Sequence, residues 1–378
     1  MSGIYIHIPF CRQACHYCDF HFSTSLKSKK DFLDALKKEI YLQRDYLGAK
    51  NISTVYFGGG TPSILSGEEI VEIVYELSKY FSIDKNAEIT LEANPDDLSK
   101  EKLKELSHTP INRLSIGVQS FSDEDLKFLH RIHNSSNAIR SVKEAQDIGF
   151  KNITIDLIYG IQTLTNEQWK KNLQTAFSHD VPHVSCYSLT VESKTALASF
   201  IKKGKIQNID PQKSVEQFEI LMSEMKNNNF IHYEISNFCK EDFYSKHNSS
   251  YWKGAKYLGL GPSAHSYDTH SRQWNVSSNS AYINSIKKNI LPFEKETLTQ
   301  EQKFNEYIMT SLRTMWGIDL QVIKNKFSRN YSSHFSKEAE KYFAQKLLKN
   351  EGEKIFLTDK GKLFADKIAS DLFVVFNK

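Results

Sequence analysis

The sequence predicts an α/β protein with a barrel-like parallel sheet as its main body and a small α+β domain at its C-terminal end. Three observations support this fold class. Short apolar runs alternate with helical patterns from residue 4 to about residue 235, and such alternation is typical of parallel strands joined by helical crossovers. Polar side chains recur where the predicted strands end. Past residue 236 the alternation stops.

Seven short runs rich in Ile, Val, Tyr and Phe predict the strands. They cover residues 4–8, 52–57, 87–91, 113–118, 152–158, 183–189 and, with the weakest pattern, 231–235. The stretches between them have helical periodicity. Three of these stretches begin with capping signals: Ser66 with Glu69, Thr165 with Gln168, and Asp210 before Pro211.

Polar residues at the strand ends help to choose between sheet types. Thr61 follows the second strand, Glu92 ends the third, Gln119 ends the fourth, and Asp156 lies late in the fifth. Seven strands can form a full barrel, a partial barrel or an open doubly wound sheet. Barrel-type α/β folds gather their functional residues at the C-terminal ends of the strands. The pattern therefore favours a barrel-like sheet with one functional rim.

The remaining third of the chain has a different pattern. Residues 236–290 are rich in Ser, Asn, Tyr and Trp, show little periodicity and include a glycine-rich run at 259–262. Helical patterns return at 297–315 and 336–348, and a short apolar run at 354–358 precedes an apolar helix at 361–373. We predict a core barrel over residues 1–235, a connecting segment over 236–290 and an α+β domain over 291–378.

Length and composition exclude several classes of protein. The chain has 378 residues, of which 40% are hydrophobic and 25% charged, with a net charge of +4. This balance is that of an ordinary globular protein, and the charge is too small to indicate a nucleic-acid-binding surface. No apolar run approaches the ~18 residues of a membrane span, and the first residues lack the order of a secretory signal. We expect a cytoplasmic protein that neither binds nucleic acid nor is integral to a membrane.

Three of the five cysteines lie within eight residues, directly after the first predicted strand. The spacing Cys11-x3-Cys15-x2-Cys18 suits three ligands of a [4Fe–4S] cluster, which otherwise takes four thiolates. The fourth iron then stays open for a ligand. A zinc site completed by His7, His16 or His21, or three inert thiols, are the alternatives. Cys186 and Cys239 lie elsewhere and are expected to pack as small hydrophobic residues.

The cysteine spacing after a first strand resembles that of the radical S-adenosylmethionine (SAM) enzymes, in which the open iron binds the amino and carboxylate groups of SAM. The run GGGTP at residues 58–62, after the second strand, strengthens the resemblance, because glycines let the backbone come close to a ligand. A plain strand-ending turn is the alternative explanation of that run.

Further strings resemble the oxygen-independent coproporphyrinogen III oxidase family, and most of all its heme chaperone branch. They are YIHIPFC at 5–11, YCDF at 17–20, LEANP at 91–95, GVQSF at 117–121, LHR at 129–131, DLIYG at 156–160 and HNSSYW at 247–252. The resemblance covers nearly the whole chain. It implies an incomplete (β/α)6-type TIM-like barrel with a small α+β C-terminal domain.

The resemblance also implies roles for individual residues. Cys11, Cys15 and Cys18 match the cluster ligands, Tyr5, Gly59 and Glu92 match positions at the first SAM, and His247 begins the HNxxYW motif of the chaperone branch and is the expected heme ligand. Positions that hold a second SAM in the decarboxylating enzymes are matched by Tyr17, Gly60, Thr61, Gln119, Arg131 and Asp156. The expected ligands are thus a [4Fe–4S] cluster, SAM and heme, and the expected partner is a heme-accepting protein, for example a membrane respiratory enzyme.

Three departures from the oxidases argue against decarboxylation. Asp19 and Phe20 follow the third cluster cysteine, where the oxidases have glycine and a further cysteine, and the cluster loop begins by residue 11, which leaves no N-terminal extension. The HNxxYW motif is the third departure. A heme chaperone is therefore the expected function. A coproporphyrinogen III dehydrogenase and a radical SAM enzyme acting on another substrate, such as a methyltransferase, are the alternatives.

Overall fold

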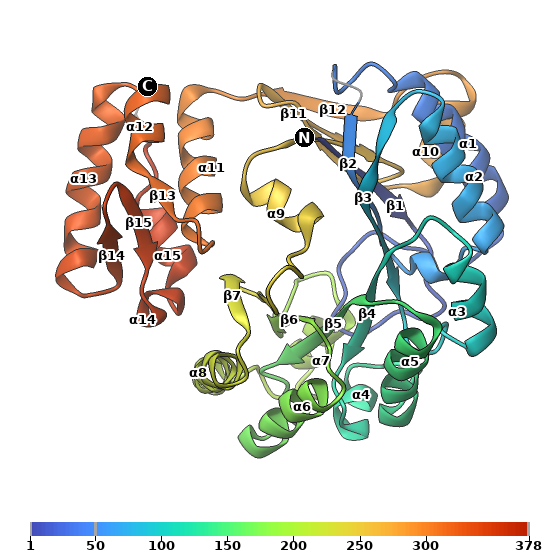
Figure 1. Cartoon of the computed structure of the whole chain (residues 1–378), viewed down its shortest axis with the longest axis horizontal. Helices are drawn as coiled ribbons and strands as arrows, with labels where there is room; N and C mark the ends of the chain where they lie inside the picture. Colours follow the sequence, from blue (N-terminus) through green and yellow to red (C-terminus); the bar gives the residue numbers. More distant parts are fainter. Residues whose placement is uncertain (1, 49–50, 376–378) are drawn as a thin grey trace.

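The computed structural model describes residues 2–48 and 51–375, and its main feature is one twelve-stranded sheet (Figure 1). The strand order is β12-β11-β10-β9-β1-β2-β3-β4-β5-β6-β8-β7. Its first six strands are β1 (Ser2–Ile8), β2 (Asn51–Gly59), β3 (Ser82–Ala93), β4 (Arg113–Gln119), β5 (Asn152–Tyr159) and β6 (His183–Ser188). These six strands pair in chain order and are all parallel. The ends of the sheet do not meet, so the prediction of an incomplete barrel is confirmed.

The last predicted strand differs in direction from the others. β7 (Ile231–Glu234) pairs antiparallel with β8 (Asn237–Cys239), which in turn pairs antiparallel with β6. The connection between β7 and β8 is only two residues long, and a link of that length can join only antiparallel strands. The parallel part of the barrel therefore ends at β6.

Helices cover the outer face of the parallel strands (Figure 1). They are α1 (Lys29–Leu42), η1 (Pro62–Ile64), α2 (Gly67–Ser78), α3 (Lys100–Ser107), α4 (Asp123–Phe128), α5 (Ser135–Ile148), α6 (Asn166–Ser178), α7 (Ala196–Lys202) and α8 (Pro211–Asn227). The predicted capping boxes form at Ser66 and Thr165, and the Asp210 side chain caps α8. Each satisfies backbone N–H groups that a first helical turn leaves unpaired. These local signals set where the crossover helices begin.

The segment 236–290 has more regular structure than its weak periodicity predicts. It forms β8, α9 (Lys246–Trp252), β9 (Lys256–Leu260), β10 (His265–Tyr267), β11 (Ser271–Asn275) and α10 (Asn279–Lys287). β9 pairs parallel with β1, so this segment extends the main sheet. Elements of three to nine residues are too short to give a clear periodic pattern, which is why the sequence suggested an irregular connection.

The C-terminal end has a second, separate sheet and core. β12 (Phe293–Thr297) still belongs to the main sheet, whereas β13 (Ile318–Asp319), β15 (Lys354–Leu357) and β14 (Leu348–Glu351) form a three-stranded one. Its helices are α11 (Gln300–Leu312), α12 (Leu320–Lys326), α13 (Arg329–Ala344), α14 (Asp359–Lys362) and α15 (Ala365–Asp371). Phe304, Phe335 and Ile368 are buried in this second core. The domain boundaries given above stay a prediction.

The position of α9 matters most for the site. It lies between the barrel strands and α11 (Figure 1). The Glu88 carboxylate on β3 accepts hydrogen bonds from the backbone N–H groups of Lys246 (3.0 Å) and His247 (2.9 Å), which anchors the first turn of α9 to the sheet. None of the helices within residues 2–48 and 51–375 is both long and apolar enough to cross a membrane.

Candidate functional site

The three clustered cysteines lie on the loop that leaves β1, and neighbouring side chains reach two of their sulfur atoms. The Thr61 hydroxyl donates to Cys11 Sγ at 3.4 Å, and Arg131 Nη1 donates to Cys15 Sγ at 3.4 Å. All three thiols are free and partly exposed. The loop is held at its base by the Cys11 backbone N–H, which donates to the Ser23 carbonyl at 3.0 Å.

The surroundings of Cys11 and Cys18 disfavour the thiolate forms of both residues as long as no metal is bound. Burial raises the pKa of Cys11 and of Cys18 to about 11, so without a metal these thiols stay protonated at neutral pH. Metal ligation requires the thiolates and releases the protons.

The arrangement of the three thiols bears on the kind of metal that they could hold. Among the described residues, no three side chains of metal-ligating type converge on a single ion position. Zinc needs such convergence, at about 2.0–2.3 Å from each ligand. In a cubic cluster each thiolate binds a different iron, so three thiols on one loop are a donor set compatible with a [4Fe–4S] cluster.

Next to this loop, the glycine run after β2 brings the backbone close to Glu92. Gly59 has φ +107°, and a Cβ there would lie 2.5 Å from His7 Nδ1, so only glycine suits the position. The Gly59 backbone N–H donates to Glu92 Oε2 at 3.2 Å, and the Tyr56 hydroxyl donates to Glu92 Oε1 at 2.7 Å. A carboxylate has about four lone-pair sites, so two remain for a cationic ligand.

Glu92 has a strongly altered acidity. Burial, with a further contribution from the charge of Asp156, raises its pKa to about 7. Burial also raises the pKa of Asp156 itself to about 6. Two carboxyl groups poised near neutrality at the C-terminal ends of barrel strands are typical of a binding or catalytic site.

Two of the positions matched to a second SAM, Thr61 and Arg131, contact cluster cysteines. Arg131 Nη2 donates to Asn94 Oδ1 at 2.6 Å and to the Gly117 carbonyl at 2.9 Å. Gln119 has φ +66°, a conformation that non-glycine residues rarely adopt, and such strain is common at functional sites. Arg131 thus reaches from the barrel wall to the sulfur of Cys15.

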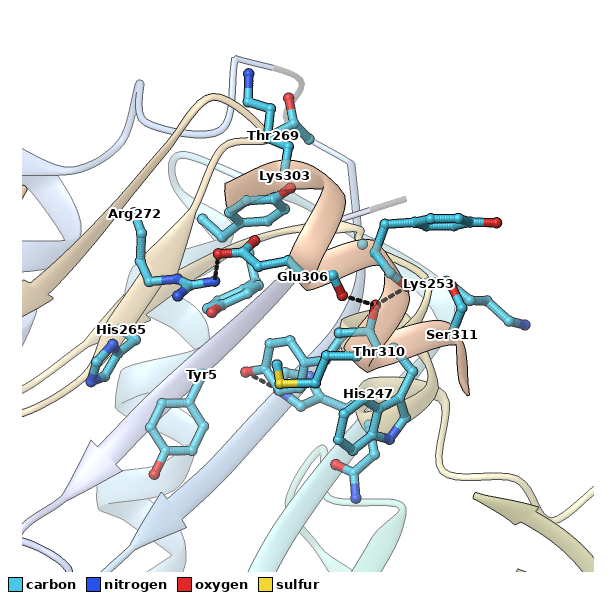
Figure 2. A pocket seen from close by; sticks show the side chains of 18 of the residues that line it. Tyr5, His247, Lys253, His265, Thr269, Arg272, Lys303, Glu306, Thr310 and Ser311 are labelled. Atoms are coloured by element: carbon cyan, nitrogen blue, oxygen red, sulfur yellow. Dashed lines mark hydrogen bonds and ion pairs between the residues drawn. The ribbon is translucent and has the colours of Figure 1, made fainter. Parts of the chain in front are cut away.

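A cavity of about 1160 Å³ opens between the barrel strands, α9 and α11 (Figure 2). Tyr5, Glu92 and His247 line it, together with Asp19 and Phe20 of the cluster loop. The six matched second-SAM positions are absent from its described lining: Tyr17, Gly60, Thr61, Gln119, Arg131 and Asp156. The predicted site residues therefore fall into two groups, one on the cavity and one around the cluster cysteines.

The surroundings of His247 differ from the irregular connecting segment that the sequence suggested. The residue lies in the first turn of α9 and is buried, with 1% of its surface exposed. Its Nδ1 is 2.8 Å from Thr54 Oγ1, its Nε2 is 2.9 Å from the Tyr251 hydroxyl, and its ring stacks on Tyr56. Burial lowers its pKa to about 3, with the charge of Arg113 as a second cause, so the imidazole is neutral.

Sequence reasoning missed several residues that line the cavity, both beside Tyr5 and on α11. Arg272 on β11 forms an ion pair with Glu306 on α11 at 2.7 Å, and His265 on β10 faces the same space (Figure 2). Lys303 on α11 also lines it. The glycine run at 259–262 was the one signal, because a Cβ on Gly259 would lie 2.0 Å from the His265 carbonyl oxygen. That run indicated a close backbone approach without showing which side chain it would present.

Comparison with known proteins defines first the class and then the family. Residues 5–176 match the radical SAM superfamily, and residues 298–364 match the HemN C-terminal domain. Together with the cluster loop, these matches define a radical SAM protein, for which the superfamily implies a [4Fe–4S] cluster and SAM.

The curated relatives narrow this class. The heme chaperone HemW of Bacillus subtilis (strain 168) is 34% identical over 371 residues, which cover 97% of this chain and 98% of that protein. HemW of Lactococcus lactis is 32% identical over 364 residues, covering 95% and 94%. The chain belongs to the HemW family of radical SAM proteins.

A solved structure agrees on the fold. The coproporphyrinogen III oxidase (HemN) of Escherichia coli, described as a radical SAM enzyme, superposes with a TM-score of 0.85 over 98% of this chain and 90% of that one. Its identity of 22% supports the shared fold alone.

Proposed function

We propose that this protein is a heme chaperone: it binds heme in the cavity beside its SAM-liganded [4Fe–4S] cluster and transfers the heme to an acceptor protein. The observation that most supports this proposal is one cavity that is lined both by Asp19 and Phe20 of the cluster loop and by a wall rich in aromatic residues and histidines. The relatives that match nearly the whole chain are named heme chaperones.

The cavity suits a large, flat, partly apolar molecule with negative groups. Its volume of about 1160 Å³ exceeds the roughly 300–1,000 Å³ of an ordinary small-molecule pocket. Its aromatic lining supplies faces on which a porphyrin can stack: Tyr5, Phe20, Tyr56, Tyr187, Tyr251, Trp252, Tyr257, Tyr267, Tyr307 and Phe327. Lys303 and Lys326 line the same space and can attract the propionates of heme.

His247 is a proposed heme ligand whose ring must first be released. Imidazole is a common axial ligand of heme iron, but both ring nitrogens of His247 are hydrogen-bonded to Thr54 and Tyr251. The Tyr251 hydroxyl therefore competes with iron for Nε2. Heme binding at this residue requires Tyr251 to turn away from the ring, a movement that also offers a way to release the cargo.

The proposed cofactor roles follow the two groups of site residues. Cys11, Cys15 and Cys18 would hold the cluster, and Tyr5, Gly59 and Glu92 would bind the SAM at its open iron. When bound, that pair supplies a redox-active centre next to the heme cavity. Polar groups of SAM would also be bound by the positions matched to a second SAM: Tyr17, Gly60, Thr61, Gln119, Arg131 and Asp156. The free thiols and the cluster suit a reducing compartment, so the proposal includes a cytoplasmic location.

A comparison of products tests the function against the oxidase alternative. The anaerobically reconstituted protein would be incubated with SAM, a reductant and coproporphyrinogen III, and separately loaded with heme and mixed with an apoprotein that accepts heme. We expect no protoporphyrinogen in the first arm. In the second arm we expect complete transfer of heme to the apoprotein, followed by the change in its absorption spectrum. Formation of protoporphyrinogen would establish the oxidase function instead.

A further inference from the structure

Four histidines line the cavity, and their ring nitrogens differ in how they are used. His7 Nε2 is 2.8 Å from the His21 carbonyl, and its Nδ1 is 3.2 Å from the Tyr5 hydroxyl. His21 Nε2 is 2.7 Å from Asn279 Oδ1. His247 is bonded at both nitrogens. Within the described residues, His265 alone of the four has neither ring nitrogen in a hydrogen bond.

The fold places His265 in this position by a close backbone contact. β10 folds back on β9, and the Gly259 backbone N–H donates to Ser266 Oγ at 2.9 Å. A Cβ on Gly259 would collide with the His265 carbonyl, so glycine is what allows the two strands to approach. Ser266 is buried on one side of β10, while its neighbour His265 is exposed on the other, toward the cavity, as the alternation of side chains along a strand requires.

The neighbours of His265 hold its ring without occupying its nitrogens. Trp274 is its register partner on β11, and the two rings stack with their centroids 6.1 Å apart and their planes at 28°. Partial desolvation by its neighbours, and then the charge of Arg272, lower the pKa of His265, which favours the neutral imidazole that binds metals. Figure 2 shows His265 and Arg272 on the barrel side, with Lys303 and Glu306 of α11 across from them.

We infer that His265 is a heme-iron ligand of the cavity, one that is available without any rearrangement of α9. The inference rests on the proposed function, since it names a second imidazole for the same cargo. His265 can bind the iron of arriving heme directly, whereas His247 becomes available only after Tyr251 releases it. The two imidazoles thus differ in when they become available to the iron.

Optical titration of the reconstituted full chain with heme tests the inference. His265→Ala should weaken heme binding by roughly tenfold or more and shift the Soret band toward that of five-coordinate heme. Free imidazole added to His265→Ala should restore the wild-type band, which a loss of structure would not permit. His270→Ala is the matched control, because His270 lies on the turn of the same hairpin but outside the cavity lining.

The outcomes separate this inference from the proposed function. If wild type and His270→Ala bind heme and His265→Ala matches them in affinity and spectrum, the inference is overturned while the proposed function stands. If the wild-type protein itself shows no saturable heme binding, the proposed function is overturned. Iron and sulfide content, measured on each variant, verifies that the radical SAM core has stayed intact.

Discussion

Replacing Glu92 by glutamine should weaken SAM binding and remove its dependence on pH near neutrality. Glu92 accepts one hydrogen bond from Tyr56 and one from Gly59, so its charge and remaining lone pairs are available to polar groups of the cationic SAM. The substitution keeps the shape and removes the charge. Hydrogen bonds to charged groups contribute about 1.5–3 kcal/mol, and this loss corresponds to roughly 10- to 150-fold weaker binding.

The pH dependence follows from the raised pKa of about 7. Cationic SAM binds best to the ionised carboxylate, so its affinity should rise with pH up to about 7 and level off above it. One pH unit below the pKa about one tenth of the carboxyl is ionised, which corresponds to a loss of about 1.4 kcal/mol. Binding below pH 7 should also release a proton to the buffer.

Isothermal titration calorimetry of the reconstituted protein, at several pH values and in buffers of different ionisation enthalpy, measures both effects. Glu39→Gln is the control, because Glu39 is a buried carboxyl with a raised pKa that lies outside the cavity lining. We expect its SAM affinity to match wild type. Glu92→Gln with wild-type affinity, or a wild-type affinity that stays constant between pH 6 and pH 8, would refute the assignment of Glu92 to SAM.

Four further predictions follow from other contacts. Cys15→Ala should lose the cluster and Cys186→Ala should keep it, as measured by iron and sulfide analysis; a cluster that survives Cys15→Ala would contradict the ligand assignment. Tyr251→Phe removes the competitor for His247, so heme should bind at least as tightly as in wild type by optical titration, and clearly weaker binding would argue against His247 as a ligand. Glu88→Ala should destabilise the fold by about 3–5 kcal/mol in chemical denaturation, because it leaves the buried charge of Arg113 and two helix N–H groups without their carboxylate. An unchanged denaturation midpoint would show that Glu88 does not anchor α9 to the sheet. Gly259→Ala should cost about 1–3 kcal/mol or more, since the new Cβ overlaps the next strand, and a stability equal to wild type would contradict that close contact.

The parallel strands and their helices could be predicted because local signals set them. The bounds of β1 to β6 lie within two residues of the predicted ones, except that β3 begins five residues earlier, and capping residues such as Ser66 mark where helices begin. The cluster loop could also be predicted, because its three cysteines lie within eight residues. Patterns of this kind involve residues that are close to one another in the chain, so they can be recognised in a single sequence.

The long-range features of the site could not be predicted in the same way. β9 pairs with β1 across about 250 residues of chain, and no local pattern announces such a pairing. The cavity takes its walls from β1, β10, β11, α9 and α11, so residues such as His265 and Glu306 acquire a role only when these elements meet. The burial of His247 likewise comes from Thr54 and Tyr56 on a distant strand.

Titration of the anaerobically reconstituted wild-type chain with heme tests the central claim most directly. The account predicts saturable binding of one heme per chain, with an absorption spectrum that shows imidazole ligation and an iron–sulfur band that persists. Heme binding that does not saturate, or a heme spectrum that is the same with the protein as in buffer, would contradict the claim that this HemW-family protein carries heme in the cavity between its barrel and α11.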